Sequence, residues 1–197
     1  MKWLLPFLSY VIVVTFTPGP NNVIAMAIAN NCGLKKSYKF IFGITSGVFI
    51  IFNLASFFNI FLLNIAPVIR PYTAIAGAIY MTYLGIVFLI QPEEKDMQKK
   101  ELSYIQGILL QFINPKVLLY ALTVYSTFII PNVSSKGVIF LFGIFLAVTA
   151  FTATSLWALF GAVFQRFLKK FRRPFNIAMA ILLFYSAASI SGLLDII

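Results

Sequence analysis

Long apolar runs separated by short polar stretches dominate the chain, and their lengths predict six membrane-spanning helices. Each run has the roughly 20 residues that a helix needs to cross the hydrocarbon core of a bilayer. The expected spans cover about residues 3–31, 38–65, 72–91, 103–131, 137–164 and 175–194. Prolines flank several of these runs, where proline is tolerated. The pattern therefore predicts a single all-α integral membrane domain over residues 1–197.

Two of the six spans carry a proline break near the middle of the membrane. The first break is Thr17-Pro18-Gly19-Pro20-Asn21-Asn22, and the second is Gln111-Phe112-Ile113-Asn114-Pro115-Lys116. Proline removes a backbone donor and its ring clashes with the preceding turn, so each span should be interrupted there. Paired interrupted spans in the two halves of a membrane chain indicate a transport site.

The two halves of the chain also resemble each other. The matching pairs are Gly43-Ile44 with Gly143-Ile144, Arg70-Pro71 with Arg173-Pro174, and Pro20 with Pro115. Their similar spacing suggests a duplicated unit of three spans, with copies over about residues 3–91 and 103–195. A unit with an odd number of spans inserts its second copy upside down. The expected fold is therefore six transmembrane helices as two inverted three-helix repeats, with helices one and four broken at mid-membrane.

Composition and charge fit a membrane protein. The chain is 61% hydrophobic and 10% charged, too few polar groups to cover a soluble domain of this length. Its net charge of +10 lies in short loops, so membrane orientation explains it and no nucleic acid partner is expected. The loops after spans one, three and five hold 11 of the 15 Lys and Arg residues. The positive-inside rule places these loops in the cytoplasm and both termini outside.

The N-terminal apolar run resembles a secretory signal. No small-residue cleavage site follows it before the first proline break, so we expect an uncleaved first span. The chain has no histidine, one cysteine (Cys32) and five acidic residues, all outside the expected spans. These counts exclude a zinc or iron site built from His and Cys and any Ser-His-Asp chemistry. We expect no metal, no cofactor and no enzymatic activity.

Lys116 is the only charged residue deep within an expected span. It lies 15 positions from both Glu101 and Pro131, which is about 22 Å from each end of a continuous helix. A lysine stem does not reach that far, and a lysine at the membrane centre costs about 2.5 to 3.5 kcal/mol on insertion scales. Lys116 should therefore face a polar cavity or partner. We expect it to contact a substrate carboxylate or a proton-coupled group, or to donate hydrogen bonds to the carbonyls freed by Pro115.

The helix start after Pro20 offers free N–H groups and a positive potential, which suit a carboxylate. Neutral amide and hydroxyl side chains at both breaks add further donors and acceptors. The candidate substrate-binding residues are Thr17, Pro18, Gly19, Pro20, Asn21, Asn22, Gln111, Asn114, Lys116 and Tyr120. The structural alternatives are a proline kink held by neighbouring helices and ordinary interhelical hydrogen bonding.

These motifs resemble the LysE/RhtB family of amino-acid exporters. The resemblance rests on the first break, on Gly33 and Gly43 after it, and on Asn114-Pro115-Lys116. Residues 110–114, 119–120, 126–128, 164–166 and 176–177 resemble its cysteine/O-acetylserine efflux branch. The resemblance covers nearly the whole chain and implies a bacterial inner-membrane exporter of amino acids or their derivatives. Many relatives carry an aspartate where this chain has Asn21, so no carboxylate-based proton coupling is expected there.

Residues and resemblance together predict an exporter of small neutral amino acids or derivatives that works by alternating access to a midplane site. The expected partners are an amino-acid substrate and membrane lipid. The exact substrate, the coupling ion and a homo-oligomeric state stay open. Threonine, homoserine and leucine are alternative substrates. A membrane scaffold or lipid-binding protein without transport is the alternative from a different class.

Overall fold

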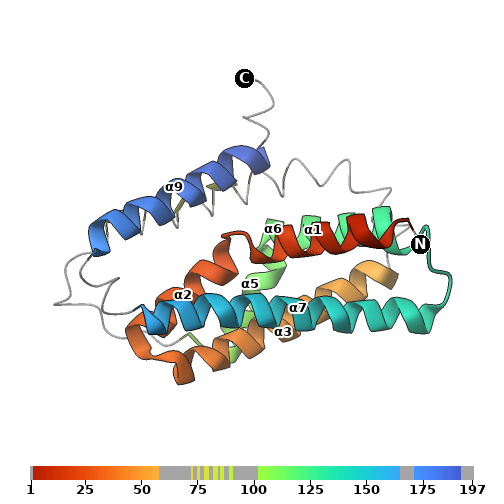
Figure 1. Ribbon diagram of the computed structural model, residues 1–197, viewed down its shortest axis with the longest axis horizontal. Coiled ribbons are helices and arrows are strands. Elements are labelled where there is room, and N and C mark those ends of the chain that lie inside the picture. The colour runs from red at the N-terminus through yellow and green to blue at the C-terminus, as the bar shows by residue number, and fades with distance from the viewer. Residues whose placement is uncertain are drawn as a thin grey trace.

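The computed structural model describes residues 2–57, scattered positions between 72 and 90, residues 102–164 and residues 171–191. These residues form helices, turns and short connections, with no strand among them, so the all-α prediction is confirmed for this part of the chain (Figure 1). The helices are α1 (Leu4–Phe16), α2 (Pro20–Cys32), α3 (Leu34–Phe57), α5 (Tyr104–Ile113), α6 (Pro115–Thr123), the π-helix η1 (Val124–Ile129), α7 (Lys136–Val163) and α9 (Arg172–Ser191).

Among the described residues, two helices, α3 with 24 residues and α7 with 28, are long and apolar enough to cross a membrane by themselves. Two further spans arise if each bent pair counts as one: α1 with α2, bent by 44°, and α5 with α6 and η1, bent by 64°. The predicted breaks in the first and fourth spans are thus confirmed as sharp bends between separate helices. α9 overlaps the sixth expected span, which was placed at about residues 175–194, and its apolar stretch Asn176–Tyr185 is shorter than a full crossing.

The third expected span lies mostly outside the described residues, as do the loops beside it. The inverted repeat therefore stays a prediction. One loop can be corrected: α2 ends at Cys32, and α3 begins at Leu34 after the single residue Gly33. Gly33 has φ 90°, a conformation that favours glycine. The chain therefore turns within one residue, and Lys35, Lys36 and Lys39 lie in the first turns of α3, not in a loop.

Glycines allow the helices of the bundle to approach closely. α3 packs against α2, α5 and α7, and it runs alongside α7 in Figure 1. A Cβ atom at Gly107 of α5 would meet the backbone of α3 at Phe40 and Gly43, and one at Gly161 of α7 would meet the backbone of α2 at Met26. Small residues at helix contacts are typical of membrane bundles. These glycines therefore let α5 approach the backbone of α3, and α7 approach the backbone of α2.

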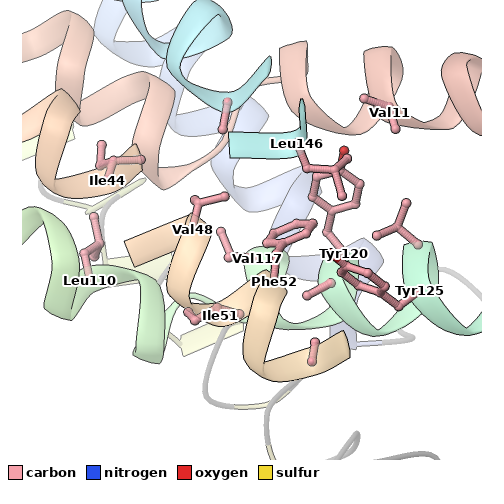
Figure 2. Packing of buried hydrophobic residues seen from close by; sticks show 14 of the residues in the cluster. Val11, Ile44, Val48, Ile51, Phe52, Leu110, Val117, Tyr120, Tyr125 and Leu146 are labelled. Carbon is pink, nitrogen blue, oxygen red and sulfur yellow. The ribbon is translucent and has the colours of Figure 1, made fainter. Parts of the chain in front are cut away.

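The largest buried core cluster joins residues of α1, α2, α3, α5, α6, η1 and α7, and Figure 2 shows part of it. Within it the Phe52 ring contacts Tyr120 edge-to-face, with 5.1 Å between ring centroids, and lies 6.2 Å from Tyr125. Tyr125 belongs to η1, an unexpected π-helical turn that continues directly from α6. Single π-turns often occur at functional sites. The aromatic cluster of Phe52, Tyr120 and Tyr125 borders the site described next.

Candidate functional site

The two helix breaks lie against each other, although they are about 95 residues apart in sequence. Pro20 and Pro115 each occupy the first turn of the helix that follows its break, where the missing N–H has no intrahelical partner to lose. Residues 17–19 separate α1 from α2, and Asn114 alone separates α5 from α6. Each break thus exposes the carbonyl groups of one helix end and the N–H groups of the next helix start.

The carbonyl groups at the end of α1 accept hydrogen bonds from side chains beyond the helix. Asn22 Nδ2 donates to the carbonyls of Thr15 and Thr17 at 3.0 and 3.1 Å. The Trp157 indole of α7 donates to the Phe16 carbonyl at 3.1 Å. A broken helix inside a membrane protein is tolerated where neighbours satisfy the freed backbone groups. The first break is therefore stabilised by specific partners.

Lys116, at the start of α6, reaches across to the end of α1. Its ammonium nitrogen lies 3.0 Å from the carbonyl oxygen of Thr17, 3.1 Å from the Thr17 hydroxyl and 3.4 Å from the carbonyl oxygen of Pro18. The negative end of a helix dipole favours a cation. If Lys116 has a structural role, its partners are not the carbonyls freed by Pro115, as one alternative supposed. They belong to the other break.

The start of α2 has no side-chain cap. Its N-cap is Gly19, and the backbone N–H groups of Asn21 and Asn22 have no acceptor within the described part of the chain. At the second break, by contrast, the Asn114 side chain accepts a hydrogen bond from the backbone N–H of Lys116 at 3.1 Å. Free N–H groups at a helix start are suited to an anion. Of the two breaks, the first is the better site for a carboxylate.

Three amide side chains join the two breaks. Asn21 Nδ2 donates to Gln111 Oε1 at 2.8 Å, and Gln111 Nε2 donates back to Asn21 Oδ1 at 3.1 Å. Asn114 Nδ2 donates to the same Asn21 oxygen at 3.1 Å. Gln111 and Asn114 are fully buried. These amides use much of their hydrogen-bonding capacity on one another, so they hold the two breaks in a fixed position relative to each other.

A cavity of about 40 Å³ lies beside the breaks. Its wall consists of Val14, Thr15, Gly19, Pro20, Asn21, Asn22, Val48, Phe52, Asn114, Lys116, Val117, Tyr120, Ala150 and Thr154. Two hydrogen bonds join pairs of these lining residues. Thr15 Oγ1 donates to the Tyr120 hydroxyl, and Thr154 Oγ1 donates to Asn22 Oδ1, both at 3.3 Å. One water molecule needs about 10–15 Å³ of such a cavity. The cavity must therefore widen to admit an amino acid.

Seven of the ten predicted residues line this cavity: Gly19, Pro20, Asn21, Asn22, Asn114, Lys116 and Tyr120. Thr17 and Pro18 are connected to it through Lys116, and Gln111 through Asn21. The threonines Thr15 and Thr154 were missed, together with the apolar wall. An isolated threonine in an apolar span is a weak signal, because Thr149 and Thr152 on the same helix as Thr154 bond only to their own helix backbone.

The charge of the site comes from Lys116 alone. None of the described residues is acidic, since all five carboxylates of the chain lie in the remaining segments. The partners of Lys116 are accordingly neutral oxygens. Within the described ranges no group of His, Cys, Asp or Glu is arranged to hold a metal ion. The arrangement offers one cation, one uncapped helix start and several neutral donors and acceptors around a small space.

Comparison with known proteins gives one consistent result. Residues 12–191 match the family model described as LysE type translocator. The chain is 32% identical over 185 residues to proteins named cysteine/O-acetylserine efflux protein from Escherichia coli K12, E. coli O139:H28 and Shigella sonnei. Each alignment covers 93% of this chain and 95% of the relative. No solved structure gives a match.

Proposed function

Because the chain belongs to the LysE type translocator family, we propose that it exports small neutral amino acids such as cysteine and O-acetylserine across a bacterial inner membrane. Membership supports a multi-pass amino-acid exporter, a transporter and not an enzyme. The finer statements on substrate, site and mechanism are our proposal. The observation that carries them is the polar cavity at the junction of the two breaks, whose lining residues include one charged side chain, that of Lys116.

The proposed site recognises both charges of a zwitterion. The uncapped N–H groups of Asn21 and Asn22 and the ammonium group of Lys116 are the donors for the substrate carboxylate. The neutral oxygens around the first break accept from the substrate ammonium group, with Tyr120 and Thr154 at the edge of the space. Asn114, Gln111, Pro18 and Pro20 hold the breaks in shape.

The walls of the cavity fit a small side chain. Val48, Phe52, Val117 and Ala150 supply apolar surface beside the polar groups, which suits a thiol or an acetyl group better than a charge. A lysine or arginine side chain would bring a second cation next to Lys116 without a carboxylate to compensate it. Such repulsion is weakly screened where water is excluded. We therefore propose selectivity against cationic amino acids.

Transport is proposed to occur by alternating access. The amide cluster of Asn21, Gln111 and Asn114 and the contact of Lys116 with Thr17 connect the two broken spans across the site. Separation of the breaks on one side and then on the other would widen the cavity toward each face in turn. Both termini are proposed to lie outside the cytoplasm, since the basic segments concentrate on the opposite side.

Uptake into inverted membrane vesicles tests the function. Vesicles that contain the protein should accumulate labelled cysteine and O-acetylserine faster than vesicles without it. Unlabelled threonine and leucine should compete more weakly, and lysine should not compete. Absence of uptake for every neutral amino acid, with protein present in the membrane, would instead favour a scaffold or lipid-binding protein in which Lys116 and the breaks are structural.

A further inference from the structure

Three oxygens at the first break already bind an ammonium group, that of Lys116. They are the carbonyl and hydroxyl oxygens of Thr17 and the carbonyl oxygen of Pro18, at 3.0, 3.1 and 3.4 Å from Nζ. A lysine ammonium has three N–H donors, so three neutral oxygens match its donor capacity. The α-ammonium group of an amino acid is chemically the same group. These oxygens therefore form a site for any primary ammonium ion of suitable size.

A few residues further on, the same break also has hydrogen-bond donors for a carboxylate. The N–H groups of Asn21 and Asn22 have no acceptor among the described residues. One interruption thus presents negative carbonyl dipoles from the end of α1 and positive N–H dipoles from the start of α2. An α-amino acid carries an ammonium and a carboxylate group on one carbon, so its two charges are complementary to the two sides of this gap.

The stem of Lys116 passes over the backbone of this gap. A Cβ atom placed on Gly19 would lie 3.0 Å from Lys116 Nζ and 3.1 Å from Lys116 Cδ. The lysine thus lies between the two helix ends, in the position that an amino acid would need to occupy to contact both. Lys116 and a bound amino acid cannot use the Thr17 and Pro18 oxygens at the same time.

We infer that Lys116 is a tethered occupant of the substrate's ammonium subsite, and that a zwitterion exchanges places with it. The substrate ammonium takes over the oxygens of Thr17 and Pro18, and the displaced Lys116 ammonium pairs with the substrate carboxylate. This inference rests on the proposed function and specifies how its site works. The net charge of the site is the same before and after the exchange, because the incoming zwitterion is neutral.

The exchange requires both charged groups on one molecule. An amine without a carboxylate displaces Lys116 but leaves two ammonium groups side by side, which is unfavourable because like charges repel. A carboxylate without an ammonium group has no donor to replace the Lys116 ammonium at the oxygens of Thr17 and Pro18. The site therefore selects small zwitterions with a free primary ammonium group and rejects N-acylated amino acids.

A set of three matched ligands tests the exchange. Cysteine carries both charges, cysteamine lacks the carboxylate and 3-mercaptopropionate lacks the ammonium group, while all three share the thiol. Ligand affinities are measured on the purified full-length protein from the rise in Tm with ligand concentration. Wild-type protein should bind cysteine and show at least about tenfold weaker binding of the other two, because one charged hydrogen-bonding group is missing in each.

Lys116→Met should reverse part of this ranking. Removal of the tethered ammonium vacates the subsite, so cysteamine should bind roughly tenfold more tightly than to wild type, while cysteine loses its carboxylate partner and binds more weakly. Adding Thr17→Val to Lys116→Met removes one of the three oxygens and should weaken cysteamine binding by about tenfold. Thr152→Val, on the exposed face of α7, is the matched control and should leave cysteamine binding unchanged.

Cysteamine binding that is no tighter to Lys116→Met than to wild type overturns the exchange. If Lys116→Met is not obtained folded, Lys116→Gln is measured instead, since its amide can still donate to one carbonyl, and the same gain in cysteamine affinity is required. Vesicle uptake of cysteine by wild type is scored separately. If Lys116→Met gains cysteamine binding but the wild type shows no uptake, the ammonium subsite is supported and the export function is contradicted. If the wild type shows uptake but Lys116→Met gains no cysteamine binding, only the exchange is contradicted.

Discussion

The side-chain amides of Asn21 and Gln111 donate to each other, at 2.8 and 3.1 Å, across 90 positions of sequence. Each amide supplies both a donor and an acceptor to the other, a pairing that a carboxylate at either position cannot reproduce. Asn114 adds a second donor to the Asn21 oxygen. The contact links the start of α2 to the end of α5, so it fixes the two broken spans relative to each other at the cavity wall.

Gln111→Ala should destabilise the fold at this link. It removes the acceptor of Asn21 Nδ2 and one of the two donors to Asn21 Oδ1. It also leaves a void at a fully buried position, and an unpaired buried polar group costs about 1–3 kcal/mol. A lowered Tm in detergent is the expected result. Thr149→Val, which removes an exposed hydroxyl bonded only to its own helix, should change Tm little. Equal Tm values for the two variants would show that the amide pair contributes nothing to stability.

Asn21→Asp should introduce a negative charge into the site. The carboxylate would still accept from Asn114, but it would oppose Gln111 Oε1, which now accepts from Asn21. Lysine, which should not compete with labelled cysteine in wild-type vesicles, should become a competitor in Asn21→Asp because the new charge compensates its side chain. Strong competition by lysine in the wild type would mean that the pocket has a counter-charge elsewhere and that our electrostatic argument is wrong.

Lys116→Ala should reduce cysteine export at least tenfold while the protein still reaches the membrane, because an ion-paired or charge-assisted contact contributes about 1.5–3 kcal/mol. Lys116→Arg should also impair export, since a planar guanidinium does not replace a compact ammonium in a tight space. Lys136→Ala, at the start of α7, is the matched control and should transport normally. Normal export by well-expressed Lys116→Ala would leave the lysine a purely structural role.

Gly33→Ala should strain the turn between α2 and α3. Gly33 has φ 90°, and a Cβ added there would have no heavy atom within 4 Å outside its own chain neighbours, so the cost is conformational and amounts to about 1–3 kcal/mol. Gly137→Ala, in the first turn of α7 where a Cβ meets only Ser135 Oγ at 3.9 Å, should be neutral or stabilising. Thermal unfolding of the two variants in one detergent compares them directly, and similar Tm values would contradict the backbone argument.

Cys32 provides a native test of orientation. It is the only thiol in the chain and lies half-buried at the end of α2, on the side that the basic residues assign to the cytoplasm. A membrane-impermeant maleimide should leave it unlabelled in intact cells and label it in inverted vesicles. Cys32→Ser gives the background signal. Labelling of intact cells would place this end of α2 outside and reverse the proposed topology.

The apolar pattern predicted the all-helical character of the described residues, and the prolines predicted where the first and fourth expected spans break. Proline acts on its own turn by removing a donor and blocking the preceding carbonyl, so the bends before Pro20 and Pro115 follow from local sequence. The same is true of the capping box at Ser103 and Gln106, which starts α5 where expected. The family could likewise be predicted, because its motifs are contiguous in sequence.

Only the tertiary structure decided which groups meet at the breaks. Lys116 was expected to need a polar partner, yet its choice of Thr17, 99 positions away, depends on how α6 packs against α1. The pairing of Asn21 with Gln111 and the contribution of Thr154 from α7 depend on helix packing in the same way. Local sequence determines where a helix ends, but a contact between distant helix ends depends on the summed packing of the whole bundle, which no single motif encodes.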